Sequence, residues 1–118
     1  MSLLDSTQLA LESAMSGSML RQSLLANNLA NVDTPGYKPQ DVNFQGTLAA
    51  ALQSGQSPDQ AAFQPFAMSQ TVSADGNGVS QEQQSAYLAE NGLLYQTLTQ
   101  VAAKRDSILL TAIGIGQN

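Results

Sequence analysis

Cysteine and histidine are absent from this chain of 118 residues. Their absence excludes disulfides, thiol nucleophiles, imidazole bases and Cys/His metal sites. Charge is scarce as well, because Asp, Glu, Lys and Arg make up 11% of the chain, where a soluble domain usually has about 25%. The net charge is −5 and only four residues are basic, so we expect neither nucleic acid nor an anionic lipid surface as a partner.

Long apolar runs are also lacking, and none approaches the roughly 18–20 residues of a membrane-spanning helix. Residues 1–5 have no basic segment followed by an apolar core, so we expect no cleaved secretory signal. Uncharged polar residues are abundant instead, and Gln, Ser, Asn and Thr supply more than a third of the chain. A weakly charged surface of this kind lets copies of the chain pack together with little electrostatic repulsion.

Two long periodic segments flank an irregular middle, and the length allows one domain, residues 1–118. Residues 1–32 predict an N-terminal helix, residues 33–79 a turn followed by the irregular middle, and residues 80–114 a C-terminal helix. The sequence therefore predicts a mainly α protein whose two long terminal helices pack as an antiparallel coiled coil.

The apolar pattern of the first helix follows a spacing of three and four residues. Its stripe contains Leu4, Leu11, Met15, Ser18, Gln22, Leu25, Leu29 and Val32. Three further leucines lie off this stripe, so the helix carries apolar side chains on more than one side.

The second helix repeats every seven residues, the period of a coiled coil. One row is Tyr87, Leu94, Val101 and Ile108, the row beside it is Leu88, Tyr95, Ala102 and Leu109, and a third, mixed row is Asn91, Leu98, Arg105 and Ala112. Ser80 is the predicted N-cap, Gln83 completes a capping box, and Gly114 is predicted to end the helix.

The lengths of these helices predict an assembly interface. At about 1.5 Å per residue they span roughly 40 and 50 Å, and the middle is too short to cover the sides that their mutual seam leaves open. Exposed apolar stripes of this size mark interfaces. The predicted interface residues are Leu11, Met15, Leu25, Leu29, Tyr87, Leu94, Tyr95, Leu98, Val101, Ile108 and Leu109. The alternative is a compact helical bundle folded on itself.

In the middle, Phe44, Leu48 and Leu52 predict a short amphipathic helix that ends near residues 54–55. Residues 55–62 have the composition of a flexible loop. Residues 66–68 and 71–72 predict short strands of a small β-hairpin, and residues 75–78 a turn.

The exit of the first helix has a strong turn signal. Thr34, Pro35, Gly36 and Tyr37 fit a type II turn, with proline fixing φ at the second position and glycine supplying a positive φ at the third. The helix is predicted to end near Asn31, in the left-handed conformation of a C-cap. The side chains of Asn28 and Asn31 are expected to hydrogen-bond backbone groups around the corner.

This stretch resembles the signature N-x-A-N-x-x-T-P-G-Y of the bacterial flagellar rod and hook family. The matching residues are Asn28, Ala30, Asn31, Thr34, Pro35, Gly36 and Tyr37, and Lys38 and Phe44 match the usual continuation. The resemblance covers most of the chain. The short length of the chain is similar to that of the proximal rod proteins of the family.

The resemblance implies a structural subunit of the proximal rod of the basal body, which transmits torque and surrounds the export channel. It implies partners among other copies of the chain, neighbouring rod proteins, the adaptor between rod and membrane ring, and the export gate. It also implies export through the flagellar type III apparatus without signal cleavage, and a place in the cell envelope on the periplasmic side. Another proximal rod protein of the same family remains an alternative.

No residue pattern predicts an enzyme, a cofactor, a metal site or a small-molecule substrate. The nine acidic residues are scattered, and Asp33 and Asp41, which flank the turn, are expected to be solvated loop residues. A soluble coiled-coil adaptor or export chaperone is a further alternative, since it would share the heptads and the low charge. Such a protein would have no need for an Asn-rich helix exit followed by Thr-Pro-Gly-Tyr.

Overall fold

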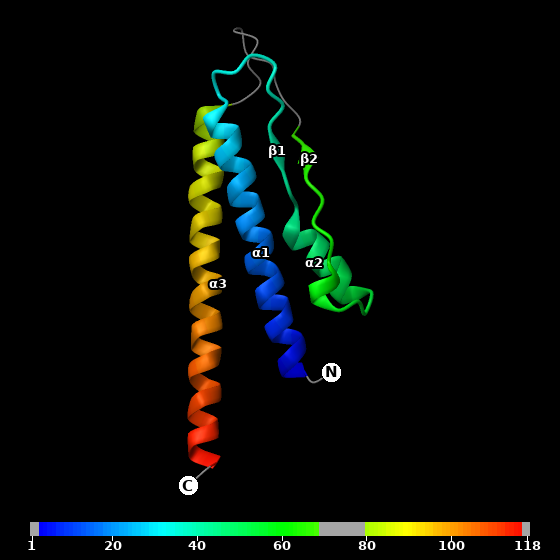
Figure 1. The fold of residues 1–118 in the computed structure, drawn as a ribbon, viewed down its shortest axis with the longest axis vertical. Helices are drawn as coiled ribbons and strands as arrows, with labels where there is room; N and C mark the ends of the chain where they lie inside the picture. Colours follow the sequence, from blue (N-terminus) through cyan, green and yellow to red (C-terminus); the bar gives the residue numbers. More distant parts are fainter. Residues whose placement is uncertain (1–2, 69–79, 117–118) are drawn as a thin grey trace.

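The computed structural model describes residues 3–68 and 80–116, and it is mainly helical (Figure 1). Its elements are α1 (Leu3–Ala30), β1 (Gln40–Asp41), α2 (Phe44–Gln53), a short 3-10 helix η1 (Pro58–Gln60), β2 (Phe66–Ala67) and α3 (Gln81–Gly116). The helices α1 and α3 run antiparallel, and the described part of the middle packs on α1 (Figure 1). This arrangement confirms the prediction of a mainly α chain with two long terminal helices. No helix in the described residues is both long enough and apolar enough to cross a bilayer.

The start of α3 agrees with the sequence and its end does not. The hydroxyl of Ser80 accepts a hydrogen bond from the Gln83 N–H at 3.2 Å, as an N-cap should. The capping box forms only by half, because the Gln83 side chain donates to the Tyr87 hydroxyl instead. The prediction that Gly114 ends the helix is wrong. A glycine ends a helix by adopting a positive φ, and Gly114 keeps a negative one, so the helix continues to Gly116.

The short helix α2 confirms the amphipathic pattern in the middle. The Asn43 side chain caps its N-terminus by accepting the Gly46 N–H at 3.0 Å, and Gly55 follows its C-terminus with a φ of +79°. Its buried face is made by Phe44 and Ala51, seven residues apart. Leu52 is exposed, so the third position of the expected stripe lies outside that face.

The strand expected at residues 66–68 is present as β2, and in the described residues it pairs with β1 across the whole middle. Residues of β1 and β2 form an antiparallel ladder in which Gln40 lies opposite Ala67 and Asp41 opposite Phe66. Between these strands lie α2 and η1, and residues 55–62, expected as a flexible loop, contain η1 with its buried Pro58. The second expected strand, residues 71–72, and the turn at residues 75–78 lie outside the described residues.

The apolar core of the described residues is small and lies between α1 and the middle. Its buried members are Leu25, Val42, Phe44 and Ala51. Phe44 packs where α1 carries Gly17, and a Cβ built on Gly17 would lie only 2.5 Å from the Phe44 Cβ. Phe44 also meets the ring of Phe63 edge-on, with the ring centroids 6.4 Å apart. This glycine therefore sets how closely α2 approaches α1.

Candidate assembly interface

The seam between α1 and α3 is polar at its centre. Ser18 and Asn28 of α1 and Gln84 and Asn91 of α3 are all 1% exposed or less. Gln84 and Asn91 are seven residues apart, so they belong to the row that the sequence marks as mixed. The mixed row thus supplies the fully buried positions of α3, while Tyr87, Leu94 and Tyr95 of the apolar rows are half-buried beside it.

Asn91 is the centre of one polar cluster in this seam. Its Nδ2 donates to the backbone carbonyl of Ser18 and to the side-chain oxygen of Gln22, both at 2.8 Å. Its Oδ1 accepts the Ser18 hydroxyl at 3.2 Å. A buried amide whose donor and acceptor are both used avoids the desolvation penalty of an unpaired group, and its bonds need one particular register.

Asn28 is the centre of a second cluster, which joins three elements. Its Oδ1 accepts the backbone N–H of Gln40 at 3.0 Å, and its Nδ2 donates to the Gln40 carbonyl at 2.8 Å. The same Nδ2 donates to the side-chain oxygen of Gln84 at 3.0 Å. One side chain of α1 therefore holds β1 on one side and α3 on the other.

An ion pair links the middle of α1 to the end of β1. The Arg21 guanidinium contacts both carboxylate oxygens of Asp41, Nε to Oδ1 at 2.9 Å and the second nitrogen to Oδ2 at 3.2 Å. It also lies over the ring of Tyr87, 5.4 Å from the centroid. Asp41 is buried and paired, so the expectation that it is solvated is wrong, whereas Asp33 is exposed. Its partner lies twenty residues away, and no sequence spacing announces such a pair.

The turn after α1 has the predicted type II geometry. Gly36 has a φ of +79°, and the Tyr37 N–H donates to the Thr34 carbonyl at 3.2 Å. Asn31 helps to close the corner, since its Nδ2 donates to the Asn27 carbonyl and its Oδ1 accepts the Thr34 hydroxyl. The predicted left-handed C-cap at Asn31 is wrong, because no described residue other than glycine has a positive φ. Its side chain bonds the free carbonyl, so the backbone does not need that conformation. The remaining signature residues, Ala30 and Pro35, are exposed.

The predicted interface residues divide into three groups by burial within one chain. Leu25 is buried. Half-buried are Leu11, Met15, Leu29, Tyr87, Leu94, Tyr95 and Leu98. Exposed are Val101, Ile108 and Leu109, all towards the C-terminal end of α3. The structure thus leaves open the apolar positions that lie furthest from the loop end of the helix pair.

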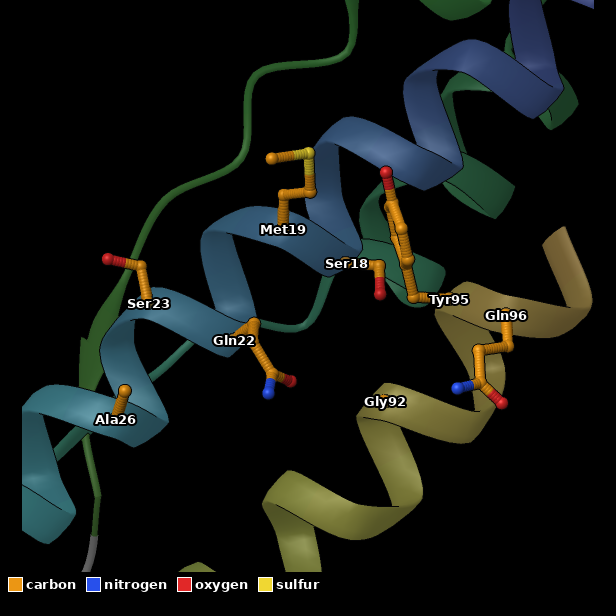
Figure 2. Close-up of a pocket in the computed structure, with 8 residues that line it drawn as sticks. All are labelled: Ser18, Met19, Gln22, Ser23, Ala26, Gly92, Tyr95 and Gln96. Carbon is orange, nitrogen blue, oxygen red and sulfur yellow. The ribbon is translucent and has the colours of Figure 1, made fainter. Parts of the chain in front are cut away.

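A groove of about 550 Å³ runs between α1 and α3 beside the Asn91 cluster (Figure 2). Its lining residues are Ser18, Met19, Gln22, Ser23, Ala26, Gly92, Tyr95 and Gln96. None of them is charged. Within residues 3–68 and 80–116, no group of three or more acidic side chains is placed to hold a metal ion.

Known proteins resemble the chain over most of its length. A family model described as "Flagella basal body rod protein" matches residues 9–38, which cover most of α1 and its exit turn. The flagellar basal body rod protein FlgB of Cereibacter sphaeroides is 37% identical over 105 residues, which cover 79% of this chain and 82% of that protein. The chain belongs to the FlgB family of flagellar rod proteins. FlgB of Bacillus subtilis is 31% identical over 112 residues, covering 85% of this chain and 87% of its own. FlgB of Escherichia coli is 34% identical over 96 residues, covering 64% and 70%.

As a FlgB-family member, the chain is a structural component of the proximal rod of the flagellar basal body. These matches select FlgB over a FlgC-like rod protein and over an adaptor or export chaperone. The α1 side of each polar cluster lies inside the matched segment. Sequence reasoning assigned no role to Gly17, Arg21 or Gln84, because each acts through a partner that only the fold brings near.

Proposed function

We propose that this FlgB-family chain transmits torque as a subunit of the proximal rod and surrounds the export channel. In this proposal α1 and α3 form an antiparallel coiled coil in the inner layer of a helical tube. The observation that carries it is the exposed apolar end of α3, where Ile108 is 57% exposed in the single chain. Apolar helix surfaces of this kind are covered by neighbours in an assembly.

The polar clusters of the seam support the same function. A torque-transmitting subunit has to keep its helices in one register, and a buried polar residue in a heptad row favours one register over slipped ones. Asn91 and Gln84 occupy such positions, and their bonds reach Ser18 and Asn28 of α1. The apolar rows beside them are thereby held at defined angles, where neighbouring subunits bind them.

The proposal includes the partners and the route that the family implies. Residues 1–118 act as one rod-type domain, exported by the flagellar type III apparatus without signal cleavage, and work on the periplasmic side of the envelope. The partners are copies of the chain, neighbouring rod proteins, the adaptor to the membrane ring and the export gate. The predicted interface residues contact these subunits.

Deletion of the gene tests the proposal. The deletion strain should keep its membrane ring and export apparatus but form no rod, hook or filament, as seen by electron microscopy of purified basal bodies. Expression of the wild-type chain from a plasmid should restore all three structures. A deletion strain that still builds a hook would contradict a place in the proximal rod.

The exposed position of Ile108 allows a sharper test of the interface. The change Ile108→Asp leaves the fold of the single chain intact, because the side chain is largely in water there, but it puts an unpaired carboxylate into the assembled seam. Motility should be lost while the circular dichroism of the purified chain stays unchanged. The control is Ala103→Asp, at another exposed position of α3. Normal motility with Ile108→Asp would argue against an interface between subunits at this end of α3.

A further inference from the structure

The C-terminal end of α3 is an apolar knob without a partner in the described chain. It extends well past the first turn of α1 (Figure 1), and Leu110 and Ile113 are 69% and 57% exposed. These residues are three apart on a helix, so they share one face. Residues 107–118 contain no charged residue.

The groove beside Asn91 has the complementary character. Its lining is uncharged, and Ser23, Ala26 and Gly92 provide small side chains or none. A Cβ built on Gly92 would meet no atom within 4 Å. Figure 2 shows Tyr95 and Gln22 reaching across from the two helices beside this open space. A large aliphatic side chain can enter such a groove without desolvating a charge.

The chain cannot fill the groove with its own knob. Since α3 is one continuous helix, Ile113 lies about 27 Å along the axis from Tyr95, at a rise of about 1.5 Å per residue. We infer that the groove of one copy binds the α3 end of the next copy, around Leu110 and Ile113. This inference rests on the proposed function and specifies which two surfaces join neighbouring copies.

The contact joins two different surfaces, so it is heterologous. A heterologous contact leaves a free groove on one copy and a free knob on the other, and it grows into an open helical filament unless the rotation closes a ring. A rod requires growth of this kind. The contact also defines a direction, because every copy presents its knob towards the same end.

Cysteine cross-linking of the full-length purified chain tests the contact, and the chain has no cysteine of its own. Ser23→Cys combined with Leu110→Cys should give disulfide-linked dimers, trimers and longer ladders on mild oxidation. The control combines Leu110→Cys with Ala49→Cys, an exposed position on α2, and should give only background cross-linking. Oligomers that do not cross-link through the first pair, or a chain that stays monomeric from micromolar to millimolar concentration, overturn the inference.

A mixing experiment tests the heterologous geometry. Ile113→Asp disables the knob and keeps the groove, whereas Gly92→Phe fills the groove and keeps the knob. Each variant alone should associate about 100-fold more weakly than the wild type, the cost of a desolvated carboxylate or a blocked site. An equimolar mixture should form dimers and stop there, measured by analytical ultracentrifugation. Ala49→Phe is the control and should associate like the wild type.

The outcomes separate this inference from the proposed function. A mixture that forms no dimer overturns the heterologous contact. If Gly92→Phe loses its helical circular dichroism, that variant is misfolded and cannot be used. Ala26→Arg, which blocks the groove from the α1 side, then takes the place of Gly92→Phe in the mixture. A gene deletion that abolishes the rod, together with absent cross-linking, refutes only the contact. A deletion that leaves the rod intact while the cross-link forms refutes only the proposed function.

Discussion

Replacing Gly17 by alanine tests how α2 packs against α1. The new Cβ would lie 2.5 Å from the Cβ and 2.8 Å from the Cγ of Phe44. These atoms belong to the base of a buried side chain, so they cannot rotate away, and α2 has to shift. Overpacking of this kind costs about 1–3 kcal/mol.

Two further terms set the magnitude. Alanine is favoured over glycine within a helix by about 1 kcal/mol, which opposes the clash. A shift of Phe44 would weaken its edge-on contact with Phe63, a contact type worth about 0.5–1.5 kcal/mol. We therefore expect Gly17→Ala to lower the free energy of unfolding by about 1–2 kcal/mol in total.

Gly92 is the matched control, because it is also a helix glycine but faces open space. Gly92→Ala should raise the free energy of unfolding by about 1 kcal/mol, from helix propensity alone. The assay is urea unfolding followed by far-UV circular dichroism, with the slopes compared to check that both variants unfold alike. If Gly17→Ala stabilised the chain as much as Gly92→Ala, the close approach of α2 would be wrong.

Three further substitutions test the polar clusters and the turn. Asn28→Ala should lower the free energy of unfolding by about 2–3 kcal/mol, because it leaves the backbone groups of β1 and a buried side chain of α3 unpaired. Asn27→Ala, at an exposed position, should cost about 0.5 kcal/mol or less, and equal losses of the two variants in urea unfolding would refute the role of Asn28 in joining α1, β1 and α3. Gly36→Val should cost about 1–3 kcal/mol, since a β-branched residue resists the φ of +79°, and Asp33→Ala should be neutral; a silent Gly36→Val in unfolding and motility assays would refute the turn. Asp41→Ala should cost about 3 kcal/mol by leaving a part-buried guanidinium unpaired, and a loss below that of a typical surface substitution would mean that the ion pair is solvated.

Features that depend on neighbouring residues were predictable from the sequence. The two long helices follow from a repeat of three and four residues. The N-cap at Ser80, the type II turn at Gly36 and the end of α2 before Gly55 follow from residues whose own φ or hydroxyl decides the local structure. The family signature lies in the same kind of local segment, and so it was readable as well.

Features that depend on distant partners were decided only by the tertiary structure. All three rows of α3 repeat every seven residues, so their period does not tell which of them is buried, and apolar rows are the usual choice for a seam. The fold buries the start of the mixed row against α1, where Asn91 bonds to Ser18 and Gln22 and the side-chain oxygen of Gln84 accepts from Asn28. The strand pairing of Gln40 with Ala67 and the ion pair at Asp41 likewise close over long stretches of chain. Sequence periodicity records which positions share a face of a helix, whereas the choice of the face that is buried depends on which partners the rest of the chain brings to it.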